Sequence, residues 1–154
     1  MDTTFHTKGN RLYKAEKLCS TAAVSRMFEC GSSFIAYPLR VVWAESQTAA
    51  ASSQPAPAVR FMITIPKKRV RRAVKRVLLR RRVREAYRLN RHLIVPALNE
   101  AGRHIDVAFI YLDSAPAPYS KISERMQESL ARIVEAVAGP QPQPDCDNDT
   151  LPTT

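Results

Sequence analysis

The feature that most constrains this chain is a long basic segment without helix breakers, from residue 67 to residue 91. It contains 13 Lys or Arg residues and one acid, for a net charge of +12, whereas the remainder of the chain carries −2. No Gly or Pro interrupts residues 70–94, so we predict one long helix that Pro96 closes. Charge of this density weakens a compact fold unless a polyanion neutralises it, and we therefore expect a nucleic-acid partner.

Helical periodicity divides this segment into a packing face and a charged face. The packing face is predicted to hold Arg76, Leu79, Val83, Ala86, Tyr87 and Asn90, and the charged face Ala73, Val77, Arg80, Arg81, Arg84, Arg88 and Arg91. An ordinary solvated face mixes both signs of charge, whereas this one nearly lacks acids. Arginine outnumbers lysine 10 to 3 in the segment, and its planar fork pairs with phosphates, which favours folded RNA.

The other elements follow from capping residues and from hydrophobic periodicity. In chain order we predict a short helix from an N-cap at Ser20 to Gly31, strands over 34–45 and 59–65, the long helix, a turn over 99–102, a strand over 105–112 and a helix over 120–138. Pro38 confines the first half of its strand to an edge or bulge. The order predicts an α/β (α+β) two-layer sandwich, in which helices cover a small mixed sheet.

Composition predicts one domain over residues 1–139 that contains a flexible, uncharged loop at 46–58. Residues 140–154, with four prolines and three aspartates, are expected to form a disordered acidic tail. The chain shows no secretory signal and no apolar run of membrane length, so we expect a cytoplasmic protein without membrane contact. The three cysteines are odd in number and far apart, which supports neither a disulfide framework nor a zinc site, and Cys19 and Cys30 are expected to be buried, inert thiols.

We assign no catalytic side chain and no metal ligand. The acidic residues Glu85, Asp106 and Asp113 do not have the spacing of a converging carboxylate pair. The aromatic residues Phe28, Phe34, Tyr37 and Trp43 form either a stacking platform for a single strand or plain core, and the sequence leaves both readings open. Under either reading Arg11, Lys14 and Lys17 can supply phosphate contacts.

The run from Ile65-Pro66-Lys67-Lys68 to Tyr87-Arg88 resembles the protein subunit of bacterial ribonuclease P. The similarity extends over residues 8–138. Further matching stretches, in the order in which that family has them, are Asn10-Arg11-Leu12, Met27-Phe28-Glu29-Cys30-Gly31, Tyr37 to Trp43 and Ile105 to Tyr111.

This resemblance implies a subunit of an endoribonuclease holoenzyme that removes the 5′ leader from precursor tRNA. It assigns catalysis to the RNA subunit with Mg²⁺, and implies the catalytic RNA and precursor tRNA as partners. It also implies a left-handed strand–helix–strand crossover. The resemblance places RNA binding at Lys67, Lys68, Arg72, Arg76, Arg80, Arg81, Arg84 and Arg88, and the leader cleft at Phe28, Arg40 and Val42.

The sequence departs from that family at Val77 and Leu78, where the family has Asn and Arg. Val77 therefore falls within the otherwise basic face, and Arg82 can supply part of the missing charge. Two other functional classes share some of these features. A general RNA-binding or ribosome-associated module shares the basic segment but needs no aromatic cleft. A helix-turn-helix DNA-binding protein requires two short helices, whereas the basic segment is unbroken.

Overall fold

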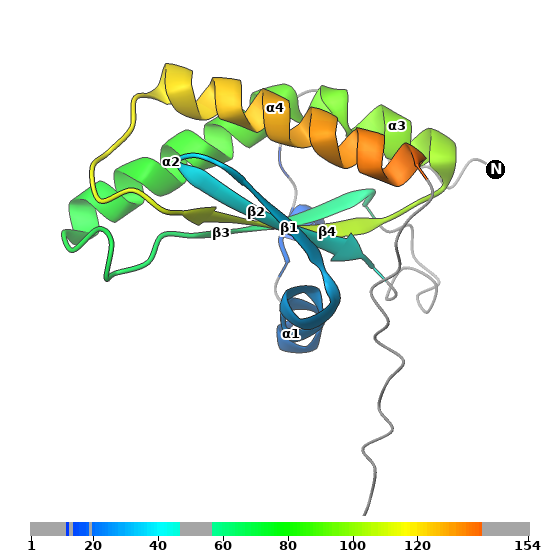
Figure 1. Ribbon diagram of the computed structural model, residues 1–154, viewed down its shortest axis with the longest axis horizontal. Coiled ribbons are helices and arrows are strands. Elements are labelled where there is room, and N and C mark those ends of the chain that lie inside the picture. Colours follow the sequence, from blue (N-terminus) through cyan, green and yellow to red (C-terminus); the bar gives the residue numbers. More distant parts are fainter. Residues whose placement is uncertain (1–11, 13, 19, 47–56, 140–154) are drawn as a thin grey trace, which may run out of the picture.

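The computed structural model describes residues 12, 14–18, 20–46 and 57–139, which form a four-stranded sheet between two unequal helical layers (Figure 1). The elements are η1 (Lys14–Glu16), α1 (Thr21–Cys30), β1 (Ser32–Ala36), β2 (Leu39–Glu45), β3 (Val59–Thr64), α2 (Ala73–Asn90), η3 (Arg91–Leu93), α3 (Val95–Ala101), β4 (Ile105–Tyr111) and α4 (Tyr119–Ala138). The predicted tail, 140–154, and the centre of the predicted loop, 47–56, lie outside the described residues. Within the described part of the chain, no helix is both long and apolar enough to cross a membrane.

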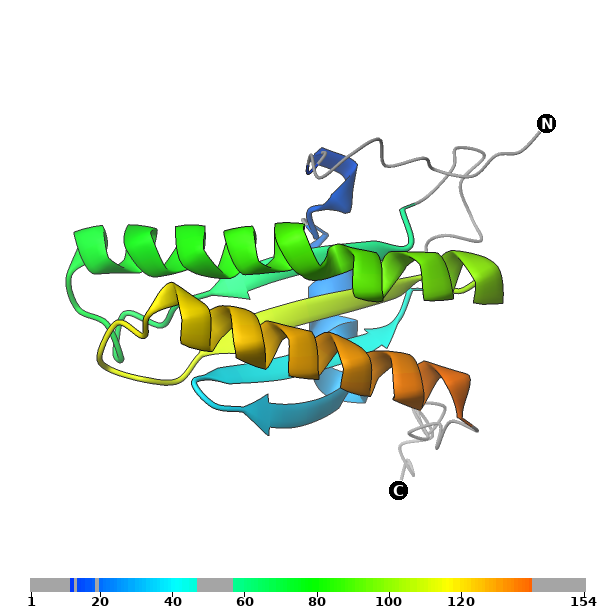
Figure 2. The same ribbon diagram turned by 90° about the horizontal axis from the view of Figure 1, so that it is seen from above.

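The sheet has the strand order β1-β2-β4-β3, and only the β3–β4 pair is parallel. In Figure 2 both of these strands run toward the left, helices α2, α3 and α4 lie in front of the sheet, and β4 lies below β3. The crossover from β3 through α2 and α3 to β4 is therefore left-handed, although nearly all such crossovers are right-handed. The mixed sheet and the crossover agree with the expectations from the sequence.

The main core lies between the sheet and the layer that contains α2, α3 and α4. The ring of Tyr87 from α2 packs between Phe61 of β3 and Phe109 of β4, with ring centroids 4.5 and 6.0 Å away. The predicted packing face of the basic helix is confirmed, and α4 buries one face in the same core. The buried residues are Leu79, Val83, Ala86, Tyr87 and Asn90 in α2, and Ile122, Met126, Ser129, Leu130, Ile133 and Val137 in α4.

A smaller core attaches α1 to the opposite face of the sheet, where Met27 packs with Val42 and Ala108. Ser20 caps this helix as predicted, because its hydroxyl accepts the amide of Ala23. Gly31 follows the helix, and a Cβ there would clash with the carbonyl oxygen of Met27 and lie 2.8 Å from that of Trp43. The glycine therefore allows the end of α1 to lie close to β2.

Two element predictions were wrong. Residues 34–45 do not form one strand, because the chain turns at the cis Tyr37-Pro38 bond and β1 pairs back onto β2 in an antiparallel hairpin. The expected helix over 70–94 begins at Ala73 and ends at Asn90. Pro96 does not close it but starts α3, since a first helical turn does not need the missing N–H.

The predictions for the 99–102 turn and for Cys30 also need correction. Asn99 lies inside α3, and only Gly102 leaves the helix, at φ 67°. Cys30 is disulfide-bonded rather than a free thiol, and the other half of that bond lies outside the described residues. An odd number of widely spaced cysteines carries no signal for such a pair.

Candidate nucleic-acid interface

The charged residues of α2 continue into the connection between β3 and the helix. Burial of the apolar side of α2 leaves the opposite side toward solvent, and the connection folds into a turn at 67–69 because the carbonyl of Pro66 accepts the amides of Arg69 and Val70. We define the basic surface as the exposed cations of these two segments. They are Lys67, Lys68, Arg69, Arg71, Arg72, Lys75, Arg80, Arg81 and Arg84.

Two predicted RNA-binding arginines are engaged within the protein. Arg76 is partly buried, and its Nη1 donates to the carbonyls of Val70 and Arg71 at 2.9 and 2.6 Å. Arg88 forms an ion pair with Glu85 one turn earlier, and this hydrogen bond lowers the pKa of the Glu85 carboxyl. Their guanidinium groups are therefore less available to phosphate than those of the basic surface.

Arg82 and Arg91 also differ from expectation. Nη1 of Arg82 donates to the carbonyl of Ala117 at 2.6 Å, so this arginine joins α2 to the chain before α4. Arg91 was predicted on the charged face, but only 4% of its side chain is exposed, and it pairs with Glu16 at 2.7 Å. The helix has already ended at Asn90, and the tighter η3 turn directs Arg91 inward.

Val77 and Leu78 are exposed, at 46% and 41% of their surface. This exposure agrees with the expected position of Val77 within the otherwise basic face, and Leu78 beside it is also exposed. Val74, one turn earlier, is 81% exposed. The basic surface therefore has an apolar interruption near the start of α2.

The other predicted site lies on the face of the sheet that carries α1. Arg40 is exposed there, and the strand register places it in one row with Ile35, Ile110 and Thr64. Phe28 at the end of α1 is 48% exposed and Ile35 is 61% exposed. We call Phe28, Ile35, Arg40, Thr64 and Ile110 the α1-side surface.

Val42 is only 3% exposed and packs in the smaller core, so it supports this surface from beneath α1 rather than lining its exposed part. The four aromatic residues do not form a single platform. Trp43 is buried in the main core, and Phe34 packs against the same core beneath Arg132 of α4. Tyr37 is exposed, and Lys121 of α4 lies 5.5 Å from the centre of its ring, which leaves Phe28 on the α1-side surface.

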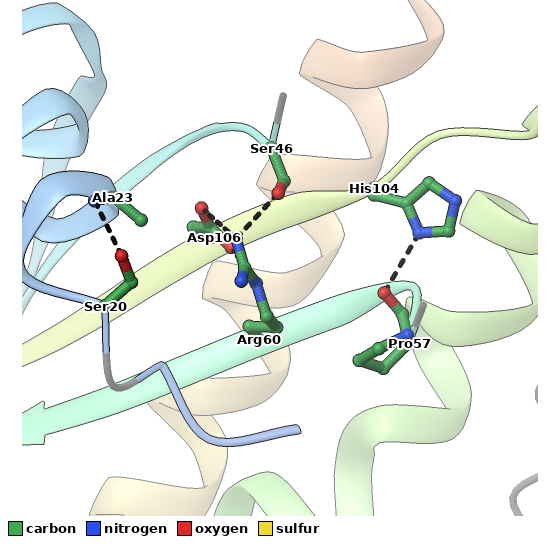
Figure 3. A network of polar contacts seen from close by, with 7 residues as sticks. All are labelled: Ser20, Ala23, Ser46, Pro57, Arg60, His104 and Asp106. Atoms are coloured by element: carbon green, nitrogen blue, oxygen red, sulfur yellow. Dashed lines mark hydrogen bonds and ion pairs between the residues drawn. The ribbon is translucent and has the colours of Figure 1, made fainter. Parts of the chain in front are cut away.

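A polar network at the other end of the sheet was not predicted (Figure 3). Arg60 of β3 binds both carboxylate oxygens of Asp106 in β4, at 2.8 and 3.0 Å, and also donates to the hydroxyl of Ser46 at 2.7 Å. His104 Nδ1 lies 3.0 Å from the carbonyl of Pro57. These contacts fix both ends of the predicted 46–58 loop, where Ala58 is also buried.

Several carboxylates of the described residues are paired separately with arginines. Glu16 pairs with Arg91, Asp106 is paired as above and Glu85 pairs with Arg88. No group of three His, Cys, Asp or Glu side chains gathers in the described part of the chain in a way that could hold a metal ion. The geometry therefore suits phosphate binding at the surface better than metal-dependent chemistry by side chains of these residues.

Comparison with known sequences gives one consistent result. A model of the family described as Ribonuclease P matches residues 12–134. The ribonuclease P protein component of Porphyromonas gingivalis is 38% identical over 124 residues, which cover 79% of this chain and 85% of that protein. The component of Chlorobaculum tepidum is 34% identical over 112 residues, covering 70% and 71%.

Solved structures share the fold at low sequence identity. The RNase P protein of Staphylococcus aureus matches with a TM-score of 0.59 and 20% identity, over 79% of this chain and 97% of that chain. The RNase P protein of Thermotoga maritima matches with a TM-score of 0.58 and 19% identity, over 75% and 96%. With the family match and the two relatives, the conclusion is that this chain belongs to the bacterial ribonuclease P protein family.

Proposed function

We propose that this chain is the protein subunit that assists a catalytic RNA in removing the 5′ leader from precursor tRNA. The observation that carries the proposal is the basic surface, whose nine cations are all exposed on the connection after β3 and on α2. An RNA backbone presents a regular array of phosphates, and cations fixed on a rigid helix can neutralise several of them together. Family membership selects the catalytic RNA as the partner of this surface.

We assign the leader to the α1-side surface. An unpaired strand can stack a base on Phe28 and place a phosphate beside Arg40, which are both exposed. β3 ends at Thr64 on this surface and leads directly into the turn with Lys67 and Lys68. The leader would therefore lie beside the end of β3, from which the chain continues to Lys67 and Lys68 and to the RNA bound along α2.

In the proposed holoenzyme the protein supplies positive charge and positions the substrate, and it does not supply the groups that react. Hydrolysis of a phosphodiester requires an activated water and a stabilised leaving oxygen, and Mg²⁺ ions bound by RNA would supply both. The residues of this chain would hold the leader and neutralise phosphates that otherwise repel one another. The reaction would take place in the cytoplasm, on precursor tRNA.

The salt dependence of binding tests the role of the basic surface. If about five phosphates are contacted, the logarithm of the affinity for the catalytic RNA should fall against the logarithm of salt concentration with a slope of about −3 to −5. Replacing Arg80, Arg81 or Arg84 by Ala should flatten the slope by about one in each case. Arg132→Ala in α4 is the control, because this exposed arginine lies outside the basic surface. An affinity that does not change with salt would contradict the assignment.

The apolar interruption gives a second test. Because Val77 and Leu78 are exposed, Val77→Asn with Leu78→Arg should change the free energy of unfolding by less than about 0.5 kcal/mol. Each regained charge-assisted contact should add on the order of 1 kcal/mol of RNA affinity, or tenfold to a hundredfold for the pair together. Thermal denaturation and RNA titration measure the two effects.

The charge-matched control for that variant is Ala131→Arg, on the exposed side of α4. It adds one positive charge away from the basic surface and should give little gain. Equal gains in RNA affinity from both variants would show that the added positive charge attracts RNA generally, and that no specific contact has been restored. Destabilisation without any gain would show that Val77 and Leu78 do not face RNA.

A general RNA-binding or ribosome-associated module is the alternative function. Such a module would bind through the basic surface but would not need the α1-side surface. Phe28→Ala and Arg40→Ala should weaken the binding of precursor tRNA that carries a leader, and should leave mature tRNA unaffected. Equal effects on both forms would favour the alternative.

A further inference from the structure

Arg76 faces the backbone of its own chain, in contrast to the exposed arginines that follow it. Its Nη1 lies 2.9 Å from the carbonyl oxygen of Val70 and 2.6 Å from that of Arg71. A terminal guanidinium nitrogen carries two hydrogens, so these two carbonyls account for both of them. The side chain is partly buried, whereas Arg80, one turn further on, is exposed.

These carbonyls belong to the connection between Pro66 and Arg72, which carries five of the nine cations of the basic surface. Few other bonds fix the connection. The amides of Arg69 and Val70 donate to Pro66, and α2 begins at an Arg72 N-cap that makes no side-chain capping bond. Five like charges within six residues repel one another and favour an extended connection. Val70 is buried in the main core, and Arg76 adds the two side-chain hydrogen bonds that join the connection to α2.

We propose that Arg76 is a positioning residue that orders the Pro66–Arg72 connection for RNA binding, rather than a phosphate ligand. The inference rests on the proposed function and refines it. By holding two successive carbonyls, Arg76 lowers the entropy of the connection before RNA arrives. Its loss therefore reduces affinity while the number of phosphate contacts in the complex stays the same.

Arg76→Met and Arg80→Met form the matched pair for the test, since both remove a guanidinium from the same helix. Arg76→Met should lower the affinity for the catalytic RNA by about three- to tenfold with an unchanged salt slope. Arg80→Met should flatten that slope by about one. Arg76→Lys should restore affinity, because an ammonium group can donate to both carbonyls.

Hydrogen exchange of the free protein supplies a readout that does not depend on RNA. The amides of Arg69 and Val70 should exchange faster in Arg76→Met than in the unaltered protein or in Arg80→Met. The amide of Ile105, which donates to the carbonyl of Ala58 at 2.9 Å far along the chain, should keep its rate. Faster exchange at both places would indicate general destabilisation and would count against the proposal. If Arg76→Met does not fold, Arg76→Gln, which keeps one donor group, is measured in the same way.

A flattened slope with unchanged exchange in Arg76→Met would show that Arg76 contacts phosphate directly, and would overturn the inference. Unchanged affinity would overturn it as well. Failure of the proposed function has a different signature, because Arg80→Met would then have no effect on binding to the catalytic RNA. The two failures are therefore distinguishable within one set of titrations.

Discussion

Glu16→Ala should destabilise the protein by about 3–5 kcal/mol, which is the effect of removing one partner from a buried ion pair. Oε1 of Glu16 lies 2.7 Å from Nη1 of Arg91, and the two side chains are only 2% and 4% exposed. Removal of the carboxylate leaves the Arg91 charge away from water without this partner. Urea denaturation, followed by the far-ultraviolet signal of the helices, measures the change in the free energy of unfolding.

The same pair also docks the segment that precedes α1. The amide of Leu18 donates to the carbonyl of Phe61 at 2.9 Å, so the docked segment runs along the free edge of β3. Burial raises the pKa of the adjacent Tyr87 hydroxyl, and the Glu16 carboxylate raises it further. We expect Glu16→Ala to expose this edge, with faster exchange of the Leu18 amide.

Glu124→Ala is the control for this prediction, because Glu124 is an exposed carboxylate on α4 and should change stability by less than about 0.5 kcal/mol. The double variant Glu16→Met with Arg91→Met should recover much of the loss, since two apolar side chains of similar length leave no buried charge. A decrease of less than about 1 kcal/mol in the free energy of unfolding of Glu16→Ala would show that water reaches the Glu16–Arg91 ion pair.

The faces of the helices could be predicted because they depend on local periodicity. Leu79, Val83 and Tyr87 recur at helical spacing, and all three are buried. The spacing predicts the direction in which a side chain leaves the helix axis, but it does not predict which distant residue that side chain contacts. Helical spacing placed Arg91 on the charged face, yet its partner Glu16 lies 75 residues earlier and joins it only in the folded chain.

The β1–β2 hairpin was missed because residues on both sides of Pro38 have similar strand propensity. A turn at Tyr37-Pro38 lacks the Gly, Asn or Asp that usually marks a two-residue hairpin loop. The family resemblance, rather than the local pattern, singled out Arg40 and Val42, and both lie on the α1 side of the sheet. Which of them remains exposed depends on where α1 crosses the sheet, and local pattern contains no information on that placement.

The candidate site likewise has features that could be predicted from the sequence and features that could not. The position of the basic surface follows from charge and periodicity, so the exposure of Arg80, Arg81 and Arg84 could be predicted. The backbone contacts of Arg76 and the ion pair of Arg88 could not, because they depend on the turn at 67–69 and on the rotamer of Glu85. Binding of RNA by these residues stays a prediction.

Protein free of RNA should not cleave precursor tRNA in Mg²⁺. The difference in cleavage rate between the protein alone and the protein with its catalytic RNA is the largest effect that we expect. Positioning of catalytic metal ions requires carboxylates that converge on one point. In the described residues Asp106 and Glu85 bind Arg60 and Arg88 instead. Cleavage is measured with end-labelled precursor and with protein purified under denaturing conditions to remove RNA. Activity that is lost in Asp106→Asn or Glu85→Gln would contradict the assignment of catalysis to RNA.

The most direct test of the account is cleavage of precursor tRNA by the catalytic RNA from the same organism, at low Mg²⁺ concentration. Three reactions are compared, which contain the RNA alone, the RNA with this chain, and the RNA with the Arg80→Ala, Arg81→Ala, Arg84→Ala triple variant. We expect this chain to stimulate release of the 5′ leader, and the triple variant to require on the order of 100-fold more protein for the same rate. Equal rates in all three reactions would contradict the account.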